Sequence, residues 1–368
     1  MRRYKTYING EWFEGTSGIV LRSVDPSNNK ELGEIVQNSK EDVEYAIESA
    51  SRSFYKTREW RDLDVQQRSD KLLKIADMIE SEIDEIAKTE SMDNGKPLRE
   101  AQADVDDAVH CFRYYAGLIR TPSGQTYNVN SNFGNMHSYT VKEPVGVCAL
   151  ITPWNFPFLM SVWKIAPALA AGNSIIFKPS SETVLSALKL FEILDKCDLP
   201  KGTANLVIGS GSTVGNLLAE SKKVDMITFT GSTSVGQGIM RAAVGNVKKI
   251  GLELGGKSPN IVFADTDIEK TVEWVMMGIF LNQGEVCCAG SRLIIEKSIK
   301  DKFLKKLVER TDKLTLGAPL DNPDMGPLIS KKHMQDVLGY IEKGKAEGAK
   351  LLCGGYKCTC LLYTSPSP

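Results

Sequence analysis

Two adjacent cysteines, Cys287 and Cys288, lie in the segment NQGEVCCAGSR (residues 282–292), a glycine-rich polar turn that follows an apolar stretch. A cysteine in such a turn can be a nucleophile, because a thiolate attacks carbonyl carbon atoms and forms a covalent intermediate. Two small structural residues that happen to be adjacent would give the same pattern. The segment alone leaves both interpretations open.

Two further polar residues lie in apolar surroundings. Glu253 is found in GLELGG, where a carboxylate costs free energy unless it is paired or takes part in chemistry. Asn155, in TPWNFP, is a neutral donor held between two prolines and two aromatic residues. It is suited to bracing that turn or to stabilising an oxyanion. With three histidines in the whole chain, we expect carboxylates to carry any acid–base chemistry.

Three glycine-rich segments could bind phosphate. GLELGGKS (251–258) matches the P-loop pattern, but its spacer residues are strand-like and Pro259 leads into another strand-like segment, so a nucleotide hydrolase is the least favoured alternative. GSGSTVG (209–215) has one residue too many for a dinucleotide fingerprint. FTGSTSVG (229–236) is more persuasive, because its turn opens a helix whose free N–H groups and dipole attract an anion.

The elements that would position these residues alternate between strand and helix. Strand-like segments are predicted at 173–179, 204–209, 225–231 and 248–255, with helices at 182–196, 213–220 and 234–243 between them. Such alternation predicts βαβ units and a parallel sheet. The pattern restarts after Gly256 with PNIVFADTD and a helix from Ile268, which predicts a second α/β domain.

The first third of the chain is predicted to be largely helical. One helix begins at the capping box of Ser39, and a longer one runs from about Val65 to Ser91. The composition then shifts at 121–135 to Ser, Asn, Gly and Gln, which predicts a surface excursion or arm. The apolar segment 146–177 is interrupted by three prolines and a lysine, so we expect buried strands and turns there and no membrane span.

The amino-acid composition limits the classes of binding partner that the protein is expected to have. Lysine plus arginine (45) balance aspartate plus glutamate (46), which argues against nucleic acid or an anionic membrane and favours a small molecule. The N-terminus lacks a secretory signal and the eight cysteines are scattered, so a cytoplasmic location is expected. Residues 358–368 carry no charge, and we interpret them as a non-native tail.

Seven collinear segments carry a family resemblance: TPWNFP, KIAPALAAGN, FKPSSET, FTGSTSVG, LELGGKSPNIV, NQGEVCCAGSR and GAPLDNPDMGPLIS. Over about residues 5–356 the chain resembles the NAD(P)-dependent aldehyde dehydrogenases. The resemblance implies an α/β fold with a Rossmann-like NAD(P)-binding domain (1–122 and 146–255), a small β oligomerisation arm (123–145) and an incomplete α/β catalytic domain (256–357).

The resemblance also implies roles for single residues. Cys287 matches the nucleophile, Asn155 the oxyanion-hole side chain that acts with the Cys287 amide, and Glu253 the general base. Cys288 falls at a neighbouring position without a catalytic role. No metal is required. The residues expected to bind the cofactor are Thr152, Pro153, Trp154, Lys178, Ser181, Gly211, Gly231, Ser232, Gly236 and Leu254.

The implied reaction is oxidation of an aldehyde to a carboxylic acid through a thiohemiacetal and a thioester on Cys287. Ser181 stands where NAD-restricted members often carry a glutamate, so both NAD and NADP are expected, with NAD favoured. Phe156 and Trp163 beside Asn155 would suit a cation such as betaine aldehyde, although a general apolar funnel is the default.

Two more expectations follow from the resemblance. The whole protein is expected to be a homodimer or homotetramer. The family's Glu-x-Phe-Gly-Pro segment is not found, so the chain is expected to be a fragment that is poorly soluble and inactive when expressed alone. An inactive cofactor-binding fragment is therefore the alternative function.

Overall fold

A seven-stranded sheet forms the centre of the molecule in the computed structural model, which describes residues 2–358. The strand order is β12-β11-β8-β9-β10-β2-β3. The first five strands of this order are parallel, and β2 and β3 add an antiparallel edge. The strands are β2 (Thr6–Ile8), β3 (Glu11–Phe13), β8 (Val147–Ile151), β9 (Ser174–Lys178), β10 (Ala204–Leu206), β11 (Met226–Gly231) and β12 (Lys249–Leu254).

The order of these strands creates a topological switch point. From β8 the chain builds β9 and β10 on one side, then crosses back to place β11 and β12 on the other side of β8. In open α/β sheets, ligands bind beyond the carboxyl ends of the strands where the winding direction reverses. The switch between β8 and β11 therefore marks where a cofactor is expected.

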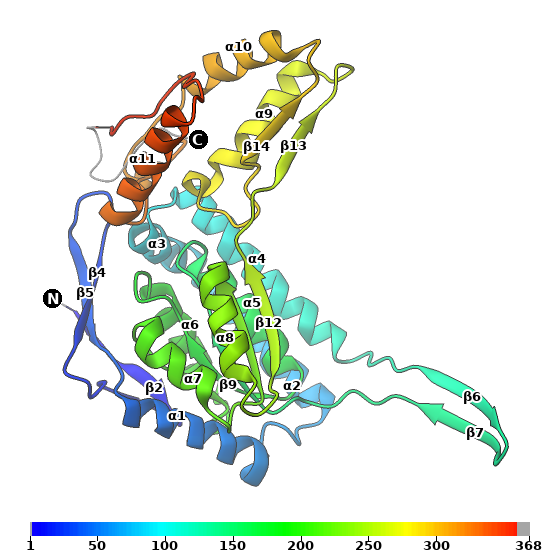
Figure 1. The fold of residues 1–368 in the computed structure, drawn as a ribbon. Coiled ribbons are helices and arrows are strands. Elements are labelled where there is room, and N and C mark those ends of the chain that lie inside the picture. The colour runs from blue at the N-terminus through cyan, green and yellow to red at the C-terminus, as the bar shows by residue number, and fades with distance from the viewer. Residues whose placement is uncertain (1, 359–368) are drawn as a thin grey trace.

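Helices cover both faces of the sheet (Figure 1). Alternate residues of β8 point to opposite sides, so Cys148 and Leu150 pack in one core and Val147, Ala149 and Ile151 in the other. The first core is completed by α2 (Val65–Ser81), α3 (Ile83–Asn94), α4 (Leu98–Leu118), α5 (Pro157–Ala170) and α6 (Leu185–Lys196). The second contains residues of α1 (Lys40–Arg52), α7 (Asn216–Glu220) and α8 (Thr233–Ala243).

The predicted strand and helix alternation from 173 to 255 is confirmed element by element. Buried strands are also found in 146–177 as expected, at β8 and β9, but the prediction of strands and turns alone was wrong there. That segment contains α5, a 14-residue helix, between β8 and β9. Most of α5 is buried, so its sequence lacks the polar face that signals a surface helix. Pro157 stands at the first helical turn, where proline is tolerated, while Pro167 lies inside the helix.

The N-terminal third also differs from expectation in two ways. Short strands β1 (Arg3–Tyr4), β4 (Val20–Val24) and β5 (Glu31–Val36) form a second sheet in the order β1-β5-β4. They are too short or too irregular to show a clear alternation of apolar and polar residues. The helix predicted over 65–91 is divided at Glu82, which has a non-helical backbone and separates α2 from α3.

A smaller α/β unit follows β12. Strands β13 (Pro259–Val262) and β14 (Arg292–Ile295) pair in parallel, and α9 (Ile268–Phe280) and α10 (Lys300–Thr311) pack against them. Helix α11 (Lys331–Ala346) comes last. The short helical segments of the chain are η1 (Ser53–Thr57), η2 (Gly211–Gly215), η3 (Leu281–Gly284) and η4 (Pro319–Asp321).

A two-stranded hairpin extends away from the body between α4 and β8 (Figure 1). It consists of β6 (Thr126–Ser131) and β7 (Gly134–Tyr139), which pair in antiparallel register. The hairpin lies within the predicted arm, 123–145. Within residues 2–358, no helix is both long and apolar enough to cross a membrane. The predicted tail lies outside the described residues from 359 onward.

Candidate active site

The segment that carries Cys287 begins with an unusual backbone. After α9, Asn282, Gln283 and Gly284 have φ values of 47°, 58° and 78°. Successive residues in the left-handed region are costly for side chains other than glycine, and such strain persists only where the surroundings hold it in place. The turn leads the chain back toward the end of β12, where the Gly256 N–H donates to the Cys287 carbonyl oxygen at 3.0 Å.

The Cys287 thiol has a pKa above its ordinary value, although backbone N–H groups lie near it. Partial burial raises its pKa, and the neighbouring Cys288 thiol adds to this effect. Backbone N–H groups of Cys287 and Cys288 lower the pKa and only partly offset the rise. The thiol form therefore dominates at neutral pH, so nucleophilic attack needs a base to accept the proton.

Glu253 is the carboxylate that shares a cavity with Cys287. Both line a cavity of about 630 Å³, together with Trp163 and Lys164. The expectation of an enclosed apolar setting for Glu253 was wrong, because β12 is an edge strand and the side chain is exposed. Sequence reasoning saw the apolar neighbours along the strand, but it could not see that the strand has a neighbour on one side only.

Lys164 is a cavity residue that sequence reasoning did not identify as functional. Its side chain is buried on α5, and its Nζ donates to Thr228 Oγ1 at 2.8 Å. Burial lowers the pKa of Lys164 to about 8, while the charge of Glu253 acts in the opposite direction. The charge of Glu253 therefore favours the protonated form of Lys164. The sequence shows only a lysine in an apolar segment, which is a weak signal.

Asn155 lies in the turn between β8 and α5, and its side chain reaches the Cys287 loop. The Asn155 Nδ2 donates to the Glu285 carbonyl oxygen at 2.7 Å, two residues before Cys287. An amide nitrogen carries two hydrogens, so one N–H is left for another acceptor. Bracing and oxyanion stabilisation are therefore compatible, although the sequence presented them as alternatives.

Several predicted cofactor residues meet at the carboxyl ends of the parallel strands. Thr152 follows β8, and its N–H donates at 3.1 Å to the carbonyl oxygen of Lys178, the last residue of β9. Gly231 and Leu254 end β11 and β12 and are paired across the ladder. Ser232 then caps α8 by accepting from the Val235 N–H at 3.4 Å. The structure places these residues around the switch point of the sheet.

Two buried groups there are suited to a ligand. The Thr152 Oγ1 is buried and has no hydrogen-bond partner among the described residues. An unsatisfied buried hydroxyl costs about 1–3 kcal/mol, which a bound polar group would recover. Lys178 is also buried; its Nζ donates to the Pro179 carbonyl oxygen at 2.9 Å, and burial lowers its pKa to about 8. The residues present therefore fit a polar, phosphate-bearing cofactor.

The glycines differ in how much the structure requires them. A Cβ at Gly236 would lie 2.9 Å from Leu254 Cδ2, so this glycine lets α8 approach β12 closely. Gly211 begins η2, but a Cβ there would meet nothing within 4 Å. Gly215 instead approaches Lys178, with its Cβ position 3.9 Å from the lysine Cε.

The remaining predicted cofactor residues, Pro153, Trp154 and Ser181, are partly buried and lie in loops that follow β8 and β9. Pro153 precedes Trp154, whose ring packs edge-on against His333 with centroids 5.2 Å apart. Trp154 therefore contacts α11 of the smaller unit. Ser181 is half-buried after β9.

The P-loop alternative is excluded by the local fold. Residues 251–254 lie inside β12, and Pro259 starts β13 after a short connection. No helix opens at this segment, so no helix terminus is present there to bind a phosphate.

Glu285 has a structural role that its sequence position did not reveal. Its carboxylate is buried, and Oε1 accepts from the Ile329 N–H at 3.1 Å with His333 Nε2 at 3.5 Å. Burial raises the pKa of Glu285 to about 8. The sequence analysis used Glu285 only to locate Cys287 two residues later. Its position in that motif was the only sequence feature that could have indicated a structural role.

Comparisons with known proteins agree with this arrangement. Residues 12–362 match the aldehyde dehydrogenase family. The betaine aldehyde dehydrogenase of Bacillus subtilis (strain 168) is 46% identical over 350 residues, which are 95% of this chain and 71% of that protein. The mitochondrial aldehyde dehydrogenase of Homo sapiens is 41% identical over 352 residues, 95% of this chain and 68% of that protein.

Solved structures give the same result. The crystal structure of betaine aldehyde dehydrogenase from Staphylococcus aureus in complex with NAD+ superposes with a TM-score of 0.94 at 40% identity, covering 98% of this chain and 72% of that one. The NAD+ complex of an aldehyde dehydrogenase from Bacillus cereus gives 0.95 at 36% identity, covering 99% and 74%. The likeness therefore extends over nearly the whole of this chain.

Proposed function

This chain belongs to the aldehyde dehydrogenase family, and from that premise we propose that it oxidises an aldehyde to a carboxylic acid with Cys287 as nucleophile, Asn155 as oxyanion donor and Glu253 as general base. One observation carries the proposal. Glu253 and Cys287 line one cavity, and Asn155, from a distant part of the sequence, is hydrogen-bonded to the loop that holds Cys287.

The residues divide the chemistry as follows. Glu253 accepts the Cys287 proton, directly or through water, and the sulfur then bonds to the aldehyde carbon while the carbonyl oxygen becomes an alkoxide. The Asn155 amide and the Cys287 N–H donate to that alkoxide; each such donor is worth about 3–4 kcal/mol when preorganised. The adduct becomes a thioester by losing a hydride, for which NAD+ would be the acceptor when bound. Once the first proton has passed from Glu253 to solvent, the Glu253 carboxylate deprotonates the water that attacks the thioester. The C–S bond breaks with its electron pair on sulfur, and a proton from Glu253 restores the Cys287 thiol.

The cofactor is proposed to lie across the carboxyl ends of β8, β9 and β11. Lys178 and Thr152 are the buried donors on one side, and the N-terminus of α8 with Ser232 faces a pyrophosphate on the other. The two structural relatives described above were solved with NAD+. Ser181 supplies no carboxylate to repel a 2′-phosphate, so we propose that NADP is also accepted, less well than NAD.

For the substrate we propose a cationic aldehyde, the class named by two of the relatives. A cavity of about 570 Å³ beside Phe156 has an acidic rim of Glu100, Asp104, Asp107 and Asp324 with Arg99 as its basic residue. The aromatic contact expected from Phe156 needs correction, because the Lys96 ammonium already lies 4.1 Å from its ring centroid. Trp163, which is 52% exposed in the cavity of Cys287, is left as the aromatic face for a substrate.

A second candidate is a polypeptide that binds cofactor without turnover. It is favoured by the small core of the unit after β12, which consists of Val262, Val272, Val275 and Phe303. Apolar residues on both of its strands are largely exposed, with Ile261 at 59% and Ile294 at 53%. Such a unit is expected to be poorly soluble and to hold the catalytic loop less firmly than the large sheet does.

The hairpin is proposed to mediate self-association into a homodimer or homotetramer. Phe133 at its tip is 96% exposed, and Tyr139 and Val141 are also largely exposed. Apolar side chains on a projecting two-stranded ribbon are suited to covering by a second copy. A cytoplasmic location and the division into domains at residues 122, 146 and 256 stay predictions.

One experiment separates these functions. Betaine aldehyde and its neutral isostere 3,3-dimethylbutanal are each supplied with NAD+ or NADP+, and reduced cofactor is measured for the wild type, Cys287→Ala and the matched control Cys288→Ala. Under the proposed mechanism, NAD+ reduction is lost in Cys287→Ala, retained in Cys288→Ala, and higher with the cationic aldehyde. Reduced cofactor that forms equally well in Cys287→Ala would contradict the proposed mechanism. Cofactor binding without any turnover would favour the second candidate.

A further inference from the structure

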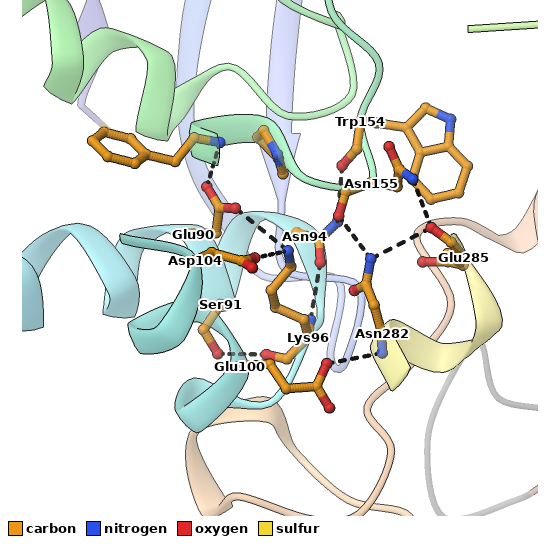
Figure 2. Close-up of polar contacts among 12 residues, drawn as sticks. Glu90, Ser91, Asn94, Lys96, Glu100, Asp104, Trp154, Asn155, Asn282 and Glu285 are labelled. Atoms are coloured by element: carbon orange, nitrogen blue, oxygen red, sulfur yellow. Dashed lines mark hydrogen bonds and ion pairs between the residues drawn. The ribbon is translucent and has the colours of Figure 1, made fainter. Parts of the chain in front are cut away.

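The corner between α3 and α4 contacts the turn that carries Asn155 (Figure 2). From this corner, Asn94 Nδ2 donates to the Trp154 carbonyl oxygen at 2.9 Å and lies 3.5 Å from the Asn155 carbonyl oxygen. The Lys96 ammonium lies over the ring of Phe156, the residue that follows Asn155. Glu90 Oε2 accepts at 2.9 Å from the Phe158 N–H, one of the free donors in the first turn of α5.

The same corner also holds the loop of Cys287. Asn282 Nδ2 donates at 2.7 Å to the Asn155 carbonyl oxygen, the oxygen that Asn94 also approaches. The Asn282 N–H donates at 2.8 Å to Glu100 Oε2 at the start of α4. Figure 2 shows both amide side chains directed at this one carbonyl group. The left-handed backbone at Asn282 is therefore supported by the turn that carries Asn155.

We propose that Asn94 is a positioning residue that sets the direction of the Asn155 side chain toward Cys287; this inference rests on the proposed roles of Asn155 and Cys287. Fixing the carbonyl groups of residues 154 and 155 fixes the backbone torsion that determines where the Asn155 side chain points. The Asn155 amide is then shared between the Glu285 carbonyl oxygen and the developing oxyanion. Within residues 2–358, the Asn94 side chain hydrogen-bonds only to the Asn155 turn and to Lys96, so its proposed effect on the reaction passes through Asn155.

Asn94 is placed for this task by its own surroundings. It is fully buried, and its Oδ1 accepts from the Lys96 N–H at 3.1 Å, so its amide orientation is fixed with Nδ2 toward the turn. Ser91, in the same corner, is equally buried, but its hydroxyl donates to the Lys96 carbonyl oxygen and does not contact Asn155. Ser91 therefore provides a control for general loosening of the corner.

Two reactions of Cys287 distinguish a change in the direction of the Asn155 side chain from a general disturbance of the fold. p-Nitrophenyl acetate acylates a thiolate: the sulfur bonds to the acyl carbon, an oxyanion forms, and p-nitrophenolate leaves with the electron pair of the broken C–O bond. Iodoacetamide alkylates the same sulfur by displacing iodide from a methylene carbon, so no oxyanion develops. The first reaction depends on the Asn155 donor and the second does not, and neither needs a cofactor.

The test uses the full 368-residue chain with Asn94→Asp, which keeps the acceptor for Lys96 N–H but removes both donors, and Ser91→Ala as control. We expect Asn94→Asp to slow acylation of Cys287 about 10- to 100-fold, as a misdirected donor would, while alkylation is unchanged. Ser91→Ala should leave both rates unchanged. Should Asn94→Asp not fold, Asn94→Ser, which restores a shorter donor without charge, should show a smaller loss in acylation alone.

Other outcomes overturn one claim or the other. Equal loss of acylation and alkylation in the Asn94 variants, or loss of acylation in Ser91→Ala as well, would show a merely structural corner and overturn the positioning role. Unchanged acylation in the Asn94 variants would overturn it too, provided that Asn155→Ala lowers acylation about 10²-fold or more. Unchanged acylation in Asn155→Ala and Cys287→Ala would instead refute the proposed function.

Discussion

Asn155 and Glu253, the proposed oxyanion donor and the proposed general base for Cys287, lie in regions of opposite character. Asn155 lies in a turn whose backbone is held by Asn94 and Asn282 and whose first helical donor is bound by Glu90. Glu253 lies exposed on the edge strand β12, and its carboxylate accepts no hydrogen bond from residues 2–358. The difference suits the two tasks, because an oxyanion donor must not move, whereas a base that serves first the thiol and later a water must reach two places.

The firmly held side of this comparison depends most on Lys96. Its buried ammonium lies 2.5 Å from Asp104 and 3.5 Å from Glu90, and these carboxylates raise its pKa despite burial, which alone would lower it. Lys96→Met would leave two buried carboxyl groups without a cation. We expect the free energy of unfolding to fall by about 3–5 kcal/mol in urea titrations.

Lys223 offers the matched control for that measurement, because it pairs with Glu48 on an exposed surface. Lys223→Met should change the free energy of unfolding by less than about 1 kcal/mol. Equal effects of the two substitutions would mean that the corner is not the stable support that the comparison requires.

Glu285, whose carbonyl oxygen accepts from Asn155, makes the stability of this region depend on pH. Its folded-state pKa of about 8 lies above the ordinary value of 4.5, so its contribution to stability is complete below about pH 4.5 and is lost as pH rises through 8. Each unit of that shift corresponds to about 1.4 kcal/mol. Glu285→Gln should therefore be increasingly more stable than the wild type between pH 5 and 8, as followed by urea unfolding at several pH values.

Comparing the two proteins at each pH isolates the carboxyl group. His333 Nε2 lies 3.5 Å from the Glu285 carboxylate, but burial lowers the pKa of His333 below its ordinary value of 6.5. The imidazole is therefore neutral in both proteins over the upper part of this pH range. A stability difference that is constant across this range would show that the Glu285 carboxyl group does not titrate as its burial predicts.

The exposed side of the comparison is tested by Glu253→Gln, which keeps the size of the side chain but cannot accept a proton. We expect hydrolysis of the acyl-Cys287 thioester to slow by about 10²-fold or more, so that acylated protein accumulates and is detected by mass. Acylation itself should recover at alkaline pH, where the thiolate forms without a base. The unfolding free energy should hardly change, because the carboxylate is exposed.

Glu143→Gln, at an exposed carboxylate near the base of the hairpin, is the matched control and should hydrolyse the thioester at the wild-type rate. If Glu253→Gln also hydrolysed it at that rate, the base would have to be another group, and Lys164 in the same cavity would be the first to examine.

Much of this fold could be predicted because its signals are local. The strands and helices from 173 to 243 carry clear periodicity and turn residues, and the capping box at Ser39 marked the start of α1. The resemblance placed Cys287, Asn155 and Glu253 in one site although they are distant in sequence. Helix α5 escaped because a helix buried on all sides has no polar face, and its prolines resemble breakers.

By itself the sequence determined the alternation of strands and helices from 173 to 255, which indicates a parallel sheet, and the residue types available for thiol chemistry, because these signals are local. Only the tertiary structure decided that β12 is an edge, which exposes Glu253, and that the corner of Asn94 and Lys96 supports the Asn155 turn. Burial and hydrogen bonding between residues 60 to 182 positions apart in the sequence are properties of packing. No local pattern encodes them, because each partner is an ordinary Asn, Lys or Glu until the chain brings the partners together.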